Sequence, residues 1–197
     1  MAERYDYVIV GAGSAGCVLA NRLSENPSNK VCLLEAGPAD WNPLIHIPAG
    51  FVKTLKDPSV NWLFETEPSW GTNGRSIAAP RGKTLGGSSS INGLVFNRGQ
   101  SMDFDTWAQR GNQGWGYADI LPYFKRYETR LGNGSPVYRG QAGEQVITDL
   151  EWRHPLCDAF IQAATDMGIP LNEDYNGVIQ EGISYVQRTS KGRLRHS

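Results

Sequence analysis

The sequence predicts an α/β fold built on a doubly wound, largely parallel sheet, of which this chain holds only the first strands. Residues 7–10 and 31–34 are short continuous apolar runs, which are typical of strands buried on both faces of a sheet. Residues 14–25 place apolar side chains at helical spacing and are followed by turn-forming residues. A strand, a helix and a second strand in this order predict one βαβ unit with parallel strands.

The chain becomes irregular after Pro38. Prolines recur through residues 43–68 with aromatic residues between them, which predicts a long excursion packed by aromatic side chains rather than by regular helices. Residues 82–99 are rich in glycine and serine, but apolar residues interrupt the pattern regularly. We therefore expect a shaped loop there that leads into a helix or a strand.

Three helices and a strand are predicted in the rest of the chain. Residues 103–110 and 118–130 show helical patterns, the second with an acidic first turn and basic residues toward its end. Residues 155–167 begin with a proline, carry apolar residues on one face and precede a glycine. Residues 183–188 favour a strand. These elements predict the start of an α+β region beside the sheet.

The composition is that of a folded protein and gives no electrostatic reason for a charged partner. A net charge of −1 argues against nucleic acid and anionic membranes, which attract clustered positive charge. No stretch approaches the roughly 20 apolar residues of a membrane span, and the N-terminus lacks the pattern of a signal peptide. We therefore expect a cytoplasmic protein and leave peripheral membrane association open.

The three cysteines are Cys17, Cys32 and Cys157. Their odd number, without a CxxC motif or a nearby histidine cluster, predicts neither a disulfide framework nor a metal site. We expect all three to be small buried apolar side chains.

A GxGxxG motif lies directly after the first predicted strand and opens the first predicted helix. Gly11 permits a tight turn, Gly13 lets a pyrophosphate approach the backbone at the helix N-terminus, and Gly16 allows close helix–strand packing. Glu35, about twenty positions after Gly16, can accept hydrogen bonds from ribose hydroxyls and repel a 2′-phosphate. The predicted dinucleotide site consists of Gly11, Gly13, Ser14, Ala15, Gly16, Glu35 and Ala36.

A second glycine- and serine-rich motif spans residues 80–96. It offers a run of backbone N–H groups, three adjacent hydroxyls at residues 88–90 and two adjacent glycines at 86 and 87. These groups suit close contact with a phosphate or a flat ring. The chemistry alone fits a second anion-binding loop.

This second motif resembles the N-terminal signature of the glucose-methanol-choline (GMC) oxidoreductase family almost position by position. The likeness extends over nearly the whole chain and includes residues 11–37, 103–107, 114–117 and 121–124. The resemblance implies a Rossmann-like sheet that binds FAD noncovalently. Some relatives attach FAD through a histidine just before the Asn92 position, but this chain has Ile91 there, which argues against a covalent link.

The resemblance also implies which residues of the second motif lie close to FAD. Leu85 to Ser88 are expected near the pyrophosphate, and Asn92 to Val95 beside the flavin ring. Trp62, an aromatic residue that could lie near the cofactor, and Arg81, at the start of the motif, complete the expected set. The set is Trp62, Arg81, Leu85, Gly86, Gly87, Ser88, Asn92, Gly93, Leu94 and Val95.

The activity implied by the resemblance is oxidation of an alcohol to an aldehyde by hydride transfer to FAD, with a protein base that takes the hydroxyl proton. In the family that base is a histidine of the C-terminal part, which this chain does not reach, so we expect the isolated chain to be inactive. Within the family the chain looks most like bacterial alcohol dehydrogenases and then choline dehydrogenase. The electron acceptor, a quinone or oxygen, is left open.

The same resemblance implies the domain organisation. We expect residues 1–37 to form the dinucleotide-binding βαβ unit, residues 38–130 to cover FAD and contact its ring, and residues 131–197 to begin a substrate-side region. The chain as a whole is expected to be a truncated N-terminal portion of the enzyme.

Two other functions are consistent with the residues. A noncatalytic module or inactive fragment would bind FAD or ADP through the same glycine loops. An NAD-dependent dehydrogenase would use Glu35 but would leave the second motif without a role. His46, His154 and His196 are expected in structural or surface positions, and the basic residues of 188–195 in a solvated loop.

Overall fold

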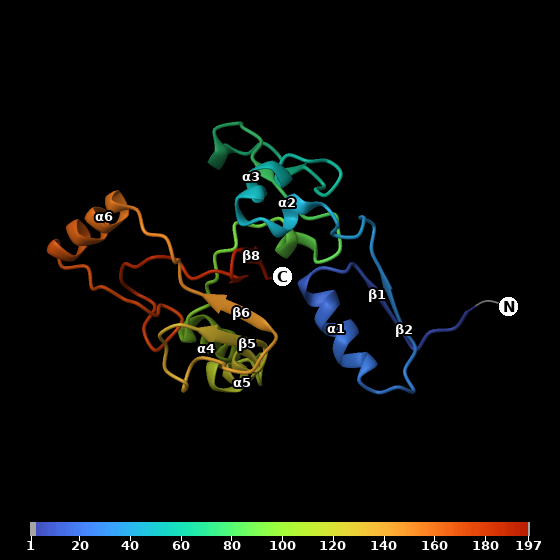
Figure 1. Ribbon diagram of the computed structural model, residues 1–197. Helices are drawn as coiled ribbons and strands as arrows, with labels where there is room; N and C mark the ends of the chain where they lie inside the picture. The colour runs from blue at the N-terminus through green and yellow to red at the C-terminus, as the bar shows by residue number, and fades with distance from the viewer. Residues whose placement is uncertain (1–2, 197) are drawn as a thin grey trace. The chain divides into compact units, whose positions relative to one another are not determined.

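The computed structural model of the chain describes residues 3–196 (Figure 1). These residues form two compact units. The first consists of residues 3–94 and Arg193–Arg195, and the second of residues 95–192 and His196.

The first unit opens with the predicted βαβ arrangement (Figure 1). Strand β1 (Tyr7–Val10) is followed by helix α1 (Ser14–Ser24) and strand β2 (Val31–Leu34). The two strands are parallel, with Tyr7 opposite Val31 and Val10 opposite Leu34. The two strands and the helix are therefore confirmed. The sheet that they form has two strands, so the doubly wound arrangement, which needs further parallel strands, stays a prediction.

The expected burial of these strands on both faces is wrong. Ile9 is buried and lies close to Gly16 of α1, but Val8 is exposed and Val10 is 85% exposed. Each strand has a single neighbour in the sheet, and α1 packs on one side only. The side chains of Val8 and Val10, which alternate with Ile9 along β1, are therefore left largely exposed.

The irregular excursion contains short elements. These are α2 (Pro43–His46), η1 (Pro48–Gly50), α3 (Phe51–Thr54), β3 (Phe64–Glu65), η2 (Trp70–Thr72), β4 (Ala78–Ala79) and η3 (Gly87–Ser90). Strands β3 and β4 pair antiparallel. The expected aromatic core is wrong, because the buried cluster is aliphatic and consists of Ile45, Val60 and Ile91 with Leu55 against it. Trp70, by contrast, is 97% exposed.

The second unit contains α4 (Ser101–Gln109), α5 (Tyr117–Tyr127), β5 (Glu128–Leu131), β6 (Gln145–Thr148), α6 (Pro155–Asp166) and β7 (Ser190–Lys191). Strands β5 and β6 are parallel. The final strand, β8 (Leu194–Arg195), belongs to the first unit. Within residues 3–196, no helix combines the length and apolarity needed to cross a membrane.

The three predicted helices of this unit are confirmed, with changed boundaries in two of them. Helix α4 begins two residues early because the N–H of Gln100 and the carboxylate of Asp103 form a capping hydrogen bond of 2.8 Å. Helix α5 stops at Tyr127, and the residues expected to extend it form β5 instead. Helix α6 agrees with the prediction, although Phe160 on its apolar face is 71% exposed.

The strand expected at residues 183–188 does not form. Ile183 makes an isolated bridge with Leu171, and Arg188 makes isolated bridges with Val95 and Thr148. Residues 183–188 therefore pair with different neighbours at their two ends and do not form a continuous ladder with one partner strand.

A buried ion-pair network explains why α5 ends where it does. Glu128 is fully buried, and its carboxylate accepts hydrogen bonds from Arg98 and, at 2.7 Å, from Nε of Arg139. Arg139 also pairs with Asp174. An unpaired buried carboxylate is costly, so pairing with two arginines fixes Glu128 in β5 rather than on the polar face of a longer helix.

One cysteine departs from expectation. The thiols of Cys17, Cys32 and Cys157 are all free, and Cys17 and Cys32 are half-buried. Cys157 is exposed on α6. The prediction of a buried side chain is therefore wrong for Cys157.

Tyr175 makes the stability of the second unit sensitive to alkaline pH. Its hydroxyl donates to the carbonyl of Phe96 at 2.9 Å and accepts from the N–H of Gln187 at 2.7 Å. Burial raises the pKa of Tyr175 above its ordinary value. A raised pKa in the folded state means that the stabilisation is complete below about pH 10 and is lost as pH rises through the folded-state pKa.

We expect Tyr175→Phe to lower the free energy of unfolding by about 1 to 2 kcal/mol near neutral pH, because the N–H of Gln187 loses its partner. Above about pH 10 the variant should lose stability with a shallower slope than the unmodified chain. Urea unfolding between pH 7 and about pH 11 measures both effects. Tyr123→Phe, on an exposed ring, is the matched control. Identical slopes for the two variants would contradict the prediction.

Candidate functional site

A cavity of about 590 Å³ lies in the first unit. Its wall is formed by the ends of β1 and β2, by residues in and beside β3, and by the second glycine-rich motif. The lining residues are Val10, Gly11, Gly13, Leu34, Glu35, Ala36, Trp62, Phe64, Arg81, Gly82, Gly87 and Ser88. Both sequence motifs that were predicted to contact a dinucleotide thus contribute to one cavity.

The first glycine loop holds α1 with its N-terminus free of side-chain caps. Gly11 has a φ of +95°, a conformation that favours glycine. A Cβ on Gly16 would lie 1.9 Å from the carbonyl oxygen of Gly11, so that only glycine permits this close approach. Gly13 is the N-cap of α1 and makes no side-chain capping bond. The N–H groups of the first helical turn are therefore available to an anion at the cavity.

Glu35 joins the glycine loop to the end of β2. Its Oε2 accepts a hydrogen bond of 2.7 Å from the N–H of Ala12, and its Oε1 accepts one of 2.9 Å from the N–H of Gly37. Each carboxylate oxygen has a second lone pair, so Glu35 can still accept from a ligand hydroxyl. The sequence had indicated a ribose contact for Glu35 but not its hydrogen bonds to the backbone of Ala12 and Gly37.

The second glycine-rich motif packs directly on the first. The N–H of Gly86 donates to the carbonyl of Ala12 at 2.8 Å. A Cβ on Gly87 would lie 2.8 Å from the Cα of Gly13 in the first loop. Within the second motif, a Cβ on Gly82 would lie 2.1 Å from the carbonyl oxygen of Gly87. The two loops therefore meet backbone against backbone, at distances that any larger residue would prevent.

The three serine hydroxyls mainly hold the second loop in shape. Ser89 donates to the carbonyl of Gly86 at 2.6 Å, and Ser90 donates to the carbonyl of Leu85 at 2.9 Å. Ser88 lines the cavity, where its Oγ accepts from the N–H of Gly82 at 3.0 Å and its own O–H remains available to a ligand. Of the three, Ser88 is positioned to contact a phosphate.

An aromatic surface forms another part of the cavity wall. The rings of Trp62 and Phe64 are stacked, with centroids 5.8 Å apart and planes 3° apart. Nζ of Lys83 lies 4.7 Å from the Trp62 ring centroid, and the N–H of Trp62 donates to the carbonyl of Arg81 at 2.9 Å. Both rings are partly exposed and can stack against a planar ligand. Phe64 was missed, although its alternation with Trp62 is the spacing of one strand face.

The structure does not bring every predicted residue to the cavity. Ser14, Ala15 and Gly16 form the first turn of α1, and they are not part of the cavity lining. Other predicted residues outside the lining are Leu85, Gly86, Asn92, Gly93 and Leu94, all in the first unit. Val95 belongs to the second unit.

Arg195 is a residue that the sequence interpretation misplaced. The expected solvated loop is wrong for this residue, which is 6% exposed and donates to both Oδ1 and the carbonyl of Asn92 at 2.7 Å. Burial lowers the pKa of its guanidinium. The clustering of basic residues in the sequence concealed that one of them is enclosed by carbonyl groups.

None of the three histidines lines the cavity. His46 is exposed, with Nε2 2.7 Å from the carbonyl oxygen of Asp40. His154 caps α6 by accepting from the N–H of Leu156 at 3.1 Å. His196 accepts from the N–H of Val146 at 3.3 Å, and burial lowers its pKa. Each imidazole thus has a contact with backbone.

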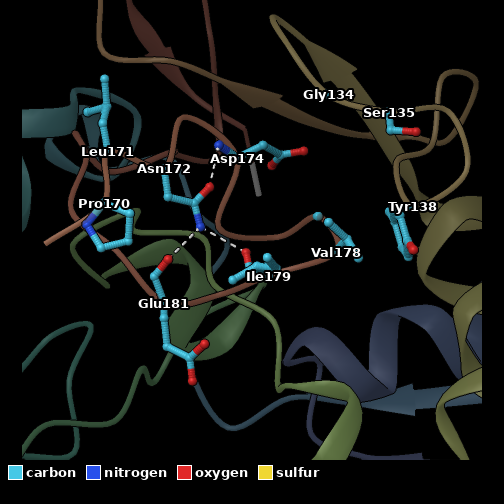
Figure 2. A pocket seen from close by; sticks show the side chains of 11 residues that line it. Gly134, Ser135, Tyr138, Pro170, Leu171, Asn172, Asp174, Val178, Ile179 and Glu181 are labelled. Atoms are coloured by element: carbon cyan, nitrogen blue, oxygen red, sulfur yellow. Dashed lines mark hydrogen bonds between the residues drawn. The ribbon is translucent and has the colours of Figure 1, made fainter.

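A second cavity, of about 430 Å³, lies in the second unit (Figure 2). Residues 134–138 and 170–181 provide its lining. Asn172 donates to the carbonyls of Ile179 and Glu181 and accepts from the N–H of Asp174, as the dashed lines in Figure 2 show. The carboxamide of Asn172 therefore stabilises its own loop, and nothing in the sequence had indicated this cavity.

Comparison with curated proteins identifies enzymes that are longer than this chain and match it over about a third of their own length. An alcohol dehydrogenase [acceptor] from Pseudomonas putida is 49% identical over 193 residues, which cover 98% of this chain and 35% of that protein. The mitochondrial choline dehydrogenase of Mus musculus is 44% identical over 196 residues, which cover 95% of this chain and 32% of that protein. The chain spans about a third of the length of these relatives.

Solved structures share the fold. Pyridoxine 4-oxidase from Mesorbium loti superimposes with a TM-score of 0.91 at 34% identity, over 98% of this chain and 38% of that chain. Formate oxidase from Aspergillus oryzae superimposes with a TM-score of 0.83 at 29% identity, over 97% of this chain and 35% of that chain.

The family model described as GMC oxidoreductase matches residues 5–197, which include both glycine-rich motifs and the cavity that they line. The match agrees with the resemblance that the second motif had indicated. The chain therefore belongs to the GMC oxidoreductase family.

Proposed function

We propose that this chain binds FAD noncovalently and forms the cofactor-binding part of an enzyme that oxidises an alcohol to an aldehyde. The observation that carries the proposal is the close packing of the second glycine-rich motif on the first around a single cavity. An NAD-dependent dehydrogenase would need the first motif alone, and the second motif would then have no ligand to contact.

Groups in the cavity wall and next to it in the sequence fit the parts of FAD. Glu35 offers carboxylate oxygens to the adenosine ribose, and the N-terminus of α1, beginning at Ser14, offers N–H groups to the pyrophosphate. Leu85 to Ser88 include the glycines that contact the first loop, and we expect them to lie near the same phosphates. We place the flavin ring toward Asn92, Gly93 and Leu94, with Trp62 and Arg81 on the wall beside the cofactor.

The residues of this chain would bind and orient the cofactor rather than carry out the proton transfer. Bound FAD would supply the acceptor for the hydride that leaves the alcohol carbon. The proton of the alcohol needs a base, and His46, His154 and His196 all lie outside the cavity lining. We therefore infer that the base is supplied from outside residues 3–196, as the resemblance implied.

The substrate and acceptor are proposed from the relatives. The names of the alcohol dehydrogenase [acceptor] and of the choline dehydrogenases support an alcohol as substrate. The electron acceptor would be a quinone or oxygen, and the name of an oxygen-dependent choline dehydrogenase from Rhizobium johnstonii supports the second. We retain residues 1–37, 38–130 and 131–197 as the proposed nucleotide-binding, FAD-covering and substrate-side regions.

The visible absorbance of the purified chain with added FAD tests this proposal. We expect bound flavin that is released when the protein is denatured, because Ile91 offers no group for a covalent bond. The chain alone should show no alcohol-dependent bleaching. Binding of ADP with the same affinity as FAD would favour the alternative, a noncatalytic nucleotide-binding module. Binding of neither would contradict the proposal.

Gly13→Ala separates binding from folding. A Cβ on Gly13 has its nearest protein atom at 4.0 Å, and the residue has an extended backbone, so stability should be unchanged or slightly higher. The methyl group would stand between the loop and a pyrophosphate, and we expect FAD affinity to fall about tenfold, as for one lost charge-assisted hydrogen bond. Fluorescence titration with FAD and urea unfolding measure the two quantities. Unchanged FAD affinity would count against a phosphate at Gly13.

A further inference from the structure

Arg195 is buried in the first unit without a carboxylate partner among residues 3–196. Its guanidinium donates to the carbonyls of Ile45 and Ser89, both at 2.8 Å, and to the carbonyl and Oδ1 of Asn92, both at 2.7 Å. A buried charge is costly unless it is paired or well hydrogen-bonded. Four neutral acceptors around one cation therefore indicate a specific task for this residue.

Three of the four acceptors of Arg195, on Ser89 and Asn92, lie on the turn that continues the cavity wall. The N–H of Asn92 donates to the carbonyl of Ser88 at 2.9 Å, which makes residues 88–92 one hydrogen-bonded turn. Ser88, at the start of this turn, lines the cavity, whereas Ser89 and Asn92 are held by Arg195. Arg195 therefore restrains the turn from the side that does not line the cavity.

Asn92 extends this restraint to Leu94. Oδ1 of Asn92 accepts from the N–H of Leu94 at 2.9 Å as well as from Arg195. Leu94 is buried and has a φ of +64°, a left-handed conformation that a branched side chain disfavours. Such conformations persist only where the surroundings hold them, and they gather at ligand-binding sites. Arg195 and Asn92 are part of those surroundings.

We propose that Arg195 is a positioning residue for FAD, which holds residues 88–94 in the conformation that receives the flavin part of the cofactor. The role rests on the proposed function. Arg195 acts through Ser89 and Asn92 and needs no contact with the reacting atoms. ADP lacks the flavin, so Arg195 should matter more for the affinity of FAD than for that of ADP.

Arg195→Lys tests this role, because lysine keeps the charge but cannot match the planar set of donors that reaches four acceptors. We expect the dissociation constant for FAD to rise about tenfold and that for ADP to change less than about threefold. The visible circular dichroism of the bound flavin should change as well. Arg193→Lys, the same substitution at an exposed position in the same segment, should leave all three readouts unchanged.

Asn92→Ala provides a second and independent variant. It removes the oxygen shared by Leu94 and Arg195 and leaves the three backbone carbonyls in place. We expect FAD to bind about fivefold more weakly, again with little change for ADP. Thermal unfolding of each variant without ligand shows whether it is folded. If Arg195→Lys does not fold, Asn92→Ala decides, because a selective loss of FAD supports the role and equal affinity overturns it.

The remaining outcomes distinguish this role from the function on which it rests. Unchanged FAD affinity in a folded Arg195→Lys variant, beside normal binding by the unmodified chain, overturns the positioning role alone. A parallel loss of FAD and ADP with a lower melting temperature assigns Arg195 a purely structural role and also overturns it. An unmodified chain that binds neither ligand overturns the proposed function and the role of Arg195 together.

Discussion

Gly16→Ala is expected to destabilise the first unit by about 3 kcal/mol, the upper range for overpacking a close contact. The added Cβ would lie 1.9 Å from the carbonyl oxygen of Gly11 and 3.4 Å from Cγ2 of Ile9. The carbonyl belongs to the backbone of the turn and cannot rotate away as a side chain can. The start of α1 must therefore move away from β1, which opens the βαβ unit. Urea unfolding of the purified chain measures the loss.

Gly71→Ala is the matched control for this substitution. Gly71 lies in η2, where an added Cβ has its nearest atom, Oγ of Ser69, at 3.9 Å. We expect its stability to stay within about 0.5 kcal/mol of the unmodified chain. Equal effects of the two substitutions would show that α1 does not depend on the close approach at Gly16.

Glu35→Gln should weaken the binding of both ADP and FAD about 100-fold. The carboxylate accepts from two backbone N–H groups, of Ala12 and Gly37, whereas an amide has one oxygen and must turn its own N–H toward the other group. The loop would lose one of these hydrogen bonds, and the ribose would lose a charge-assisted hydrogen bond, worth about 1.5 to 3 kcal/mol of binding free energy. Calorimetric titration with each ligand measures the effect.

Glu67→Gln is the control, since Glu67 is exposed and lies outside the cavity lining. The pattern of ligand selectivity is as informative as the size of the effect. We place Glu35 at the adenosine ribose, which ADP and FAD share, so its substitution should lower the affinity for both ligands alike. Arg195→Lys should lower the affinity for FAD and leave that for ADP nearly unchanged. If Glu35→Gln weakened the binding of FAD but not that of ADP, the nucleotide would have to lie elsewhere in the cavity.

The βαβ unit could be predicted from the sequence because every local signal agreed. The apolar runs, the helical spacing and the position of Gly11, Gly13 and Gly16 all indicate the same short segment, within which contacts are near in sequence. The same holds for α6, where a proline and a glycine mark both ends of a clear apolar pattern. Elements that depend on local chemistry can therefore be predicted from residue patterns alone.

The interior of the irregular excursion could not be predicted, because long-range contacts decide it. Ile45 is buried by Val60 and Ile91, which pattern analysis cannot bring together, while the prominent Trp70 stays at the surface. The end of α5 was missed for a similar reason, since Glu128 leaves the helix to pair with Arg98 and Arg139, which lie 30 and 11 residues away in the sequence. Tertiary pairing overrides helical propensity at such points.

The candidate site was predicted in part. Glycine spacing indicated the loops, and Glu35 followed from its distance to Gly16. Neither pattern reveals that Gly87 packs against Gly13 or that Arg195 donates hydrogen bonds to Asn92, because those contacts join segments that are far apart in the sequence. A charged residue in a basic tail carries no sequence signal that it will be buried.

The contact between the two glycine loops has a kinetic consequence. Gly13 and Gly87 meet only after the intervening chain has closed into a long loop, and closure of long loops slows folding. The β1–β2 pairing closes a shorter loop, from Tyr7 to Val31, than the contact between Gly13 and Gly87 does. During synthesis from the N-terminus, the first glycine loop therefore leaves the ribosome before the loop that packs against it.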